Sequence, residues 1–267
     1  MRTFARKFRV MLVAHYALAL TYRAEVFIWA LSGTLPLILA GVWIEAGKSG
    51  GRPLEPEDYA RYFFCTFIVR QLTLVWVVWE FESDVVQGRL SSKLLMPIDP
   101  MCRYLAQHLS ERVARIPVLG LLGGLFFVLY WEQMRGWRPG LSDLGWAALA
   151  IVGTFALRFT VQYTFGLLAF WTERAHSVEQ LWYLPYLYLS GLIAPLEEFP
   201  KLLQQIVLFT PFPYLIYFPS RVMMGGDLVH FSLAQGFAVM LGWTVVVFIL
   251  QRILWRLGLK HYSAMGA

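Results

Sequence analysis

The stretch GVWIEAGKS at residues 41–49 superficially resembles a phosphate-binding loop. That motif requires four residues between its two glycines, and here five residues separate Gly41 from Gly47. It also requires a strand before the loop and a helix that opens at the lysine, and the sequence around Lys48 predicts neither. We therefore expect that this chain has no ATP site and binds no cofactor of its own.

Paired carboxylates and histidines are the next candidates for chemistry. Glu80 and Asp84 lie four residues apart on one predicted helix face, a spacing that can bring two carboxylates together for acid–base catalysis. Because nothing near them supplies a substrate pocket, we favour a solvated helix end. The five histidines have no metal-ligand spacing, and HExxH does not occur. Residues 47–51, GKSGG, have the G-x-S-x-G spacing, but no strand is predicted before them, so we expect no nucleophile elbow. The sequence predicts no catalytic residue and no metal site.

Arg70 and Arg158 stand near the middle of two apolar segments. An arginine at mid-bilayer costs at least about 2.5–3.5 kcal/mol, so it faces the protein interior or a wet cavity and has a partner there. Two interpretations remain open. The arginines line a pathway for an anionic or polar cargo, or they bond between helices, for instance Arg158 to backbone carbonyls or to Gln162.

The segments that hold these residues predict an all-α integral membrane protein. The chain is 58% hydrophobic and 15% charged, whereas soluble domains carry about 25% charged residues. About 20 apolar residues in a helix cross the hydrocarbon core of a bilayer. The six predicted spans are residues 26–44, 62–79, 113–131, 144–171, 181–196 and 231–250. They fill residues 1–267 as one transmembrane domain and leave no room for a soluble catalytic domain.

The distribution of Lys and Arg predicts the orientation in the membrane. Basic residues are more frequent before the first span, after the second span and after the last span than in the alternate loops. The positive-inside rule then places both ends of the sequence in the cytosol. The net charge of +6 has its explanation in this pattern, and no concentrated basic domain points to nucleic acid.

Three segments outside the spans are distinctive. Residues 1–23 alternate apolar and basic residues at helical spacing and predict an interfacial amphipathic helix on lipid headgroups, with a plain basic flank as the alternative. Residues 80–112 form the longest cytosolic connection, in which residues 83–95 have helical periodicity and can dock on a partner. Residues 193–230 carry five prolines and predict two short helices, 202–209 and 214–224, that dip in from the outer side, or else a surface loop.

Two weaker signals concern helix packing. Gly120 and Gly124 form a GxxxG pair, for which we favour close packing within the chain over a dimer seam. Tyr186 lies deeper than an interfacial aromatic residue should, which leaves cavity lining and helix packing as alternatives.

Two stretches resemble a known family. Residues 87–97, QGRLSSKLLMP, are similar to the G-x-[LI]-x-x-x-L-x-x-P loop of ABC-2 type transporters. Residues 190–225 are similar to the family's S-G…P…P…P…R…G stretch before the final span. With the six spans and the basic first segment, the chain resembles the membrane subunit of a short bacterial ABC-2 type permease, also called a type V exporter.

The resemblance implies a mechanism and partners. Two permeases, identical or paralogous, pair in the bacterial inner membrane, and each rests on a separate cytosolic ATPase that binds ATP and Mg²⁺. The coupling residues it implies are Val86, Gln87, Gly88, Arg89, Leu90, Leu94, Pro97, Glu173 and Arg174. The pathway residues it implies are Trp29, Thr34, Arg70, Trp76 and Tyr186, and the mid-span position of Arg158 adds that residue to the pathway candidates.

Two other function classes remain as alternatives, an intramembrane lipid-modifying enzyme and a membrane scaffold or assembly factor. An enzyme would need convergent polar side chains within the bilayer, and these are sparse in the sequence. An ATPase that co-purifies with the chain would distinguish a permease from both. The cargo is not set by the fold.

Overall fold

The computed structural model describes residues 2–225, 228 and 230–262. Parts of three predicted segments lie outside the described residues, namely residue 1 of the interfacial helix, 226, 227 and 229 of the outer segment, and 263–267 of the transmembrane domain. Within the described part the secondary structure is helical and contains no strand. The helices are α1 (Arg2–Thr21), α2 (Arg23–Ser32), α3 (Leu35–Lys48), α4 (Pro56–Thr73), α5 (Val77–Val86), α6 (Leu90–Leu94), α7 (Pro100–Leu129), α8 (Trp131–Met134), α9 (Leu141–Gly166), α10 (Ala175–Leu189), α11 (Lys201–Leu208), α12 (Tyr217–Met224) and α13 (Leu233–His261). Three short 3₁₀ turns join them, η1 (Leu167–Phe170), η2 (Leu196–Glu198) and η3 (Pro213–Leu215).

Five helical segments of the described chain are long and apolar enough to cross a membrane. They are Arg23–Lys48, Pro56–Val86, Pro100–Leu129, Leu141–Phe170 and Leu233–His261. Each corresponds to one of the predicted spans, and most extend several residues beyond the predicted limits. The chain is therefore a multi-pass membrane protein.

The sixth predicted span, 181–196, is not among these five segments, and its predicted bounds are wrong at both ends. The helix there, α10, begins at Ala175, ends at Leu189 and has 15 residues, or about 22 Å of rise. After it the chain turns through Gly191 at φ +87°, a left-handed conformation that glycine adopts without strain. The carbonyl of Gly191 accepts a hydrogen bond of 2.7 Å from the Tyr62 hydroxyl, which fixes the turn to α4.

Two of the long segments are broken, and the breaks lie against each other. One separates α2 from α3 at residues 33–34, and the other separates α4 from α5 at residues 74–76. The amide of Gln71, one turn before the second break, donates 2.6 Å to the carbonyl of Ala30 at the first. Irregular backbone at membrane depth needs such internal partners, because lipid offers none.

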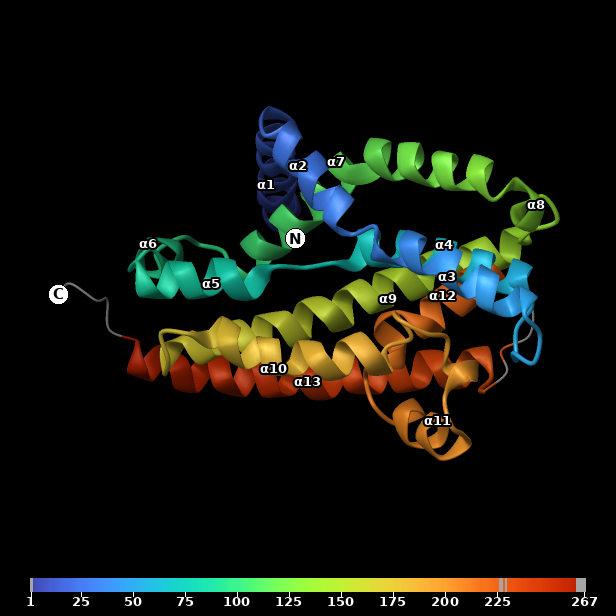
Figure 1. The fold of residues 1–267 in the computed structure, drawn as a ribbon. Helices are drawn as coiled ribbons and strands as arrows, with labels where there is room; N and C mark the ends of the chain where they lie inside the picture. The colour runs from blue at the N-terminus through green and yellow to red at the C-terminus, as the bar shows by residue number, and fades with distance from the viewer. Residues whose placement is uncertain (1, 226–227, 229, 263–267) are drawn as a thin grey trace.

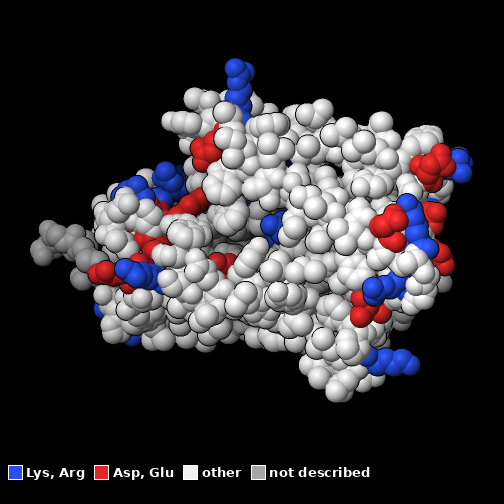
Figure 2. Space-filling model, viewed as in Figure 1, with Lys and Arg blue, Asp and Glu red and all other residues white. Residues whose placement is uncertain are grey.

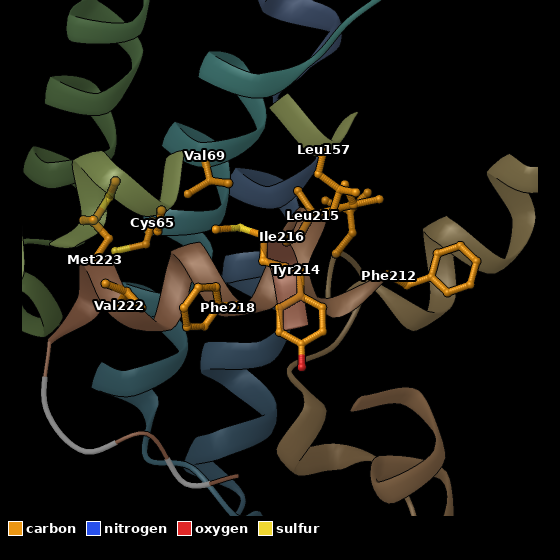
Figure 3. Close-up of a cluster of buried hydrophobic side chains, with 14 of the residues drawn as sticks. Cys65, Val69, Leu157, Phe212, Tyr214, Leu215, Ile216, Phe218, Val222 and Met223 are labelled. Carbon is orange, nitrogen blue, oxygen red and sulfur yellow. The ribbon is translucent and has the colours of Figure 1, made fainter. Parts of the chain in front are cut away.

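Helix α9 lies at the centre of the fold and contacts α4, α5, α10, α12 and α13. Figure 1 shows α9, α10 and α13 running side by side along the long dimension of the molecule. One buried cluster gathers Cys65 and Val69 of α4, Leu157 of α9 and several side chains from residues 212–223 (Figure 3). The proline-rich segment therefore supplies part of the core.

The two short helices of that segment have different surroundings. Residues 217–223 of α12 are all buried against α4 and α9. Helix α11 projects from the bundle in Figure 1, and its Leu202 is 71% exposed. Only α12 has the protein surroundings that non-helical or short helical backbone needs at membrane depth.

Helix α1 crosses the direction of α9 and α13 in the view of Figure 1 and packs on α7. The Ser110 hydroxyl of α7 donates 2.8 Å to the carbonyl of Leu12, so α1 has a protein partner along one face. The GxxxG pair of α7 is not used as expected, because a Cβ atom added at Gly120 or Gly124 would meet nothing within 4 Å. Gly123 instead faces the ring of Phe64, at 3.5 Å from such a Cβ.

Charged side chains gather toward the two ends of the molecule. Figure 2 shows blue and red groups at the left and right of the view, a smaller blue and red group at the top, and a mostly uncharged surface elsewhere between the two ends. The left end carries α6 and the end of α13, and the right end carries the connection between α3 and α4 (Figure 1). An uncharged belt between two charged ends is typical of a protein that spans a bilayer.

Candidate translocation cavity and coupling surface

A cavity of about 230 Å³ lies among α4, α5, α9 and α10. Its lining includes four of the predicted pathway residues, Arg70, Trp76, Arg158 and Tyr186. The remaining lining residues are Leu74, Val75, Trp79, Val161, Gln162, Glu179, Gln180, Trp182, Tyr183 and Leu215. The α4–α5 break contributes three consecutive residues, 74–76, so irregular backbone forms part of the wall.

Arg158 is held firmly by neighbours on two other elements. Its Nη2 donates 2.9 Å to the Tyr186 hydroxyl of α10 and 3.1 Å to the carbonyl of Leu215 in η3. The guanidinium carbon also lies 4.7 Å from the centre of the Tyr186 ring, within the range of a cation–π contact. Arg158 therefore both bonds between helices and lines the cavity, and Gln162 pairs with Glu179 instead, at 2.7 Å.

Arg70 differs from Arg158 in having no partner. Its side chain is only 8% exposed, and it makes no hydrogen bond or ion pair with any residue that the structure describes. Its Nε and Nη1 atoms are buried and unpaired. A buried guanidinium without a partner is costly, which marks Arg70 as the least satisfied group of the cavity wall.

The other two predicted pathway residues lie elsewhere. Trp29 lines a second cavity of about 700 Å³, beneath α1 and α2. Trp76 and Trp79 line both cavities, and the rings of Trp29 and Trp76 are 5.4 Å apart. Thr34 is absent from the lining of both, and its hydroxyl donates 2.8 Å to the carbonyl of Leu31 at the α2–α3 break. Thr34 thus supports the break rather than a cavity.

The predicted coupling loop folds back on the end of α5 between residues 84 and 104, which we call the coupling corner, and Asp84 lies at its centre. Its carboxylate pairs with Arg89 at 3.1 Å and accepts from Lys93 of α6 and, at 2.5 Å, from the Tyr104 hydroxyl of α7. Asp84 is 4% exposed, so the expectation that it forms a solvated helix end with Glu80 is wrong. The three donors explain why, because Arg89 in the turn before α6, Lys93 of α6 and Tyr104 of α7 all lie against the end of α5.

The predicted single helix over residues 83–95 is also wrong. Gly88 has φ +70° and separates α5 from the short helix α6. Leu90 is completely buried, so it packs inside the corner and has no surface for a partner. The apolar side chains that do reach the surface are Leu95, 88% exposed, and Met96, 47% exposed, which the sequence pattern missed.

The structure places the remaining predicted coupling residues on or beside this corner. Gln87, Arg89 and Pro97 are exposed, whereas Val86 and Leu94 are half-buried. Glu173 and Arg174 are exposed in the turn before α10. Glu82 of α5 links the two regions, because it accepts 2.7 Å from the backbone N–H of His176 and lies 2.8 Å from its Nδ1. We call the exposed residues 87, 89, 95–97 and 173–174 the coupling surface.

One group of residues has the types that hold a metal ion. Ligand atoms of Glu80, His108 and Glu111 all lie within 4.8 Å of one another. His108 is fully buried, and its two ring nitrogens stand 3.6 Å from Glu80 and 3.8 Å from Glu111, on opposite edges of the ring. Arg115 already lies 3.6 Å from Glu111 and supplies positive charge there. We therefore interpret the group as a polar contact between α5 and α7.

Comparison with known families gives one match. Residues 57–266 match the profile of a family described as "ABC-2 family transporter protein". The matched region covers both the cavity and the coupling surface and excludes α1, α2 and α3. No curated protein matches the chain.

Proposed function

This chain belongs to the ABC-2 family of transporter proteins, and from that premise we propose that it is the membrane-spanning permease subunit of an ATP-driven exporter. In this proposal the cavity between α4, α9 and α10 is part of the path of the cargo. The coupling surface receives a separate cytosolic ATPase, which supplies ATP and Mg²⁺. A second permease, identical or paralogous, completes the pathway.

The observation that supports the proposal most strongly is the position of α5. Its first residue follows the break at 74–76 that lines the cavity, and its last turn carries Asp84 of the coupling corner. A rigid helix with one end at each site can transmit a displacement from the ATPase to the cavity wall. The break supplies the hinge, because hinges absorb backbone change at the ends of elements.

The proposal extends to topology. Helix α10 would form a sixth, shorter crossing, which brings both ends of the sequence to the cytosolic side of the bacterial inner membrane. The end of α13 and the coupling corner lie at the same end of the molecule in Figure 1. Arg252 of α13 joins them through a 2.9 Å ion pair with Asp99, at the start of α7.

The test of the proposal is whether Mg²⁺-dependent ATP hydrolysis co-purifies with the tagged chain from native membranes in mild detergent. We expect activity with the unaltered chain and at least a tenfold loss with Leu95→Glu, because a charge on an apolar docking residue leaves that charge unpaired in the interface. The matched control is Leu141→Glu, since Leu141 is 90% exposed at the first position of α9, at the opposite end. A glutamate is favourable at a helix N-terminus.

Three outcomes would count against the proposal. Absence of ATPase activity from the unaltered preparation would show that no ATPase associates with the chain. Retained activity with Leu95→Glu would show that the ATPase does not dock on the coupling surface. Substrate turnover by the chain without any ATPase would favour an intramembrane enzyme. Size-exclusion profiles of both variants show whether the fold is intact.

A further inference from the structure

We propose that the 230 Å³ cavity is a binding site for the anionic group of an amphiphilic cargo, a carboxylate, sulfonate or phosphate attached to an apolar body. This inference rests on the proposed function, because it identifies the cavity as part of the cargo path. It adds the chemical class of the cargo.

The first argument comes from the polar atoms of the cavity wall. Among the described residues that line it, the buried side-chain atoms without a hydrogen-bond partner are Nε and Nη1 of Arg70, Nε of Arg158 and Nε1 of Trp76. All four are N–H donors. A buried donor without an acceptor costs about 1–3 kcal/mol, and more when it is charged. A ligand that satisfies this wall must therefore supply acceptors.

The second argument comes from charge. Two guanidinium groups and one carboxylate, Glu179, are the ionised side chains of the wall. Gln162 already donates 2.7 Å to Glu179. Guanidinium groups bind carboxylate, sulfonate and phosphate oxygens through a planar fork of donors, and such charge-assisted bonds are about twice as strong as neutral ones. Positive charge with free donors favours an anion over a neutral or cationic group.

The third argument comes from preorganisation. Arg158 is fixed by Tyr186 and the Leu215 carbonyl through Nη2, which leaves its Nε unpaired. Arg70 comes from a different helix, α4, and has no tether among the described side chains. One arginine is thus held in place while the other is free to close on a ligand. Fixed donors lower the ordering cost of binding.

The fourth argument identifies the apolar body. Aromatic side chains surround the arginines, and two of them, Trp76 and Trp79, also line the 700 Å³ cavity beneath α1. A volume of 230 Å³ is below the range of about 300–1,000 Å³ typical of complete ligand sites. The small cavity therefore suits the anionic end alone. The larger cavity is lined by three acidic residues, Glu25, Glu80 and Glu111, and by one arginine, Arg115, so its acidic groups outnumber its guanidinium groups. The anionic end is therefore left to the two arginines of the smaller cavity.

The experiment compares two aromatic probes that differ in charge, 1-naphthalenesulfonate and neutral 1-naphthalenesulfonamide. Binding to the full chain in phosphatidylcholine nanodiscs is measured by quenching of tryptophan fluorescence, because three tryptophans line the cavity. We expect the unaltered chain to bind the sulfonate at least tenfold more tightly than the sulfonamide. Arg70→Gln should weaken sulfonate binding about tenfold or more and change sulfonamide binding less than about twofold, since charged hydrogen bonds contribute about 1.5–3 kcal/mol.

The matched control is Arg135→Gln, because Arg135 is 61% exposed in a surface pair with Glu132 and lies outside the cavity. Equal affinity of the unaltered chain for the two probes overturns the inference, and this comparison needs no variant to fold. Sulfonate binding that survives Arg70→Gln unchanged also overturns it. Since the assay contains no ATPase, the inference can fail while ATPase association, and with it the proposed function, stands.

A second arm distinguishes the two sources of an anionic amphiphile. Phosphatidylglycerol replaces part of the phosphatidylcholine in the nanodiscs. If the cargo is a membrane lipid, phosphatidylglycerol should compete with the sulfonate in the unaltered chain. If the cargo is a soluble organic anion, sulfonate affinity should be independent of phosphatidylglycerol. Either outcome, with the sulfonate preference, supports the anionic class.

Discussion

At the scale of single residues, buried charges divide into those with partners and those without. Asp84 has three donors, one each from the turn before α6, from α6 and from α7, and Arg158 has a hydroxyl, a carbonyl and an aromatic ring. Arg70 has no partner within the described chain. Asp84 stabilises the fold, Arg158 is fixed by its neighbours but keeps its Nε unpaired, and Arg70 has buried donors without any acceptor. This difference separates Asp84, whose charge is satisfied within the fold, from the two arginines that we propose bind the ligand.

Asp84→Ala should destabilise the coupling corner strongly. The substitution removes the acceptor of Arg89, Lys93 and Tyr104 and leaves Lys93, 16% exposed, without its carboxylate. Loss of one partner of a buried pair costs about 3–5 kcal/mol. The measurement is thermal unfolding of the solubilised chain, followed by size-exclusion chromatography.

Asp58→Ala is the control for this prediction. Asp58 pairs with Arg61 at 3.5 Å across one turn of α4, and its side chain is 33% exposed. Partly exposed pairs contribute at most about 1 kcal/mol, so the midpoint should change little. Equal midpoints for the two variants would show that the Asp84 contacts do not hold the corner together.

The interior position of the two arginines could be predicted from the sequence, but the hydrogen-bond partners of the buried charges could not. An arginine in an apolar segment is conspicuous, so Arg70 and Arg158 could be identified as interior residues. The partners of Arg158 are 28 and 57 positions away, and no local pattern connects them. The same is true of Asp84, whose donor Tyr104 lies 20 positions along the chain.

At the scale of elements, α13 depends on two glycines for its contact with the rest of the bundle. A Cβ atom added at Gly258 would lie 2.1 Å from the ring of Phe170, and one at Gly236 would lie 2.2 Å from the ring of Phe218. Gly242, in the same helix, has nothing within 4 Å. The glycines at the two contacts set how closely α13 approaches its neighbours.

Gly258→Ala should therefore lower the unfolding midpoint, while Gly242→Ala should leave it unchanged or raise it. Overpacking typically costs about 1–3 kcal/mol. Alanine in a helix interior gains about 1 kcal/mol over glycine where space is free. Thermal denaturation of the two variants in the same detergent measures the difference. A Gly258→Ala midpoint at or above that of Gly242→Ala would contradict the close contact.

The long helices were predictable because the thickness of the bilayer sets their length. The breaks within them were less predictable, because tertiary contacts determine where a helix is interrupted. Five long apolar helices follow from hydrophobicity alone. The break at 74–76 contains no Pro or Gly, and its stabilisation depends on Gln71 and Ala30, which are distant in sequence. The break at Gly88 did carry a local signal, a glycine within an apparently continuous helical pattern.

At the scale of the whole molecule, two charged ends and an uncharged belt define an axis that we align with the membrane normal (Figure 2). Helix α5 and the break before it connect the cavity, within the belt, to the coupling surface at one end. The proposed function requires the coupling surface to face the cytosol, because the proposed ATPase partner is cytosolic. The alignment and the orientation are both open to a direct test.

Cysteine accessibility tests the orientation. Ser49 is exposed after α3 at one end, and Ser92 is exposed in α6 at the other. In a Cys102→Ser background, where buried Cys65 is the remaining thiol, a membrane-impermeant maleimide should label Ser49→Cys in intact spheroplasts. It should label Ser92→Cys only after permeabilisation, because the excess of Lys and Arg retains that end in the cytosol. The reverse pattern would place the coupling surface outside the cell, where no ATP-driven partner could reach it, and the permease assignment of this surface would fail.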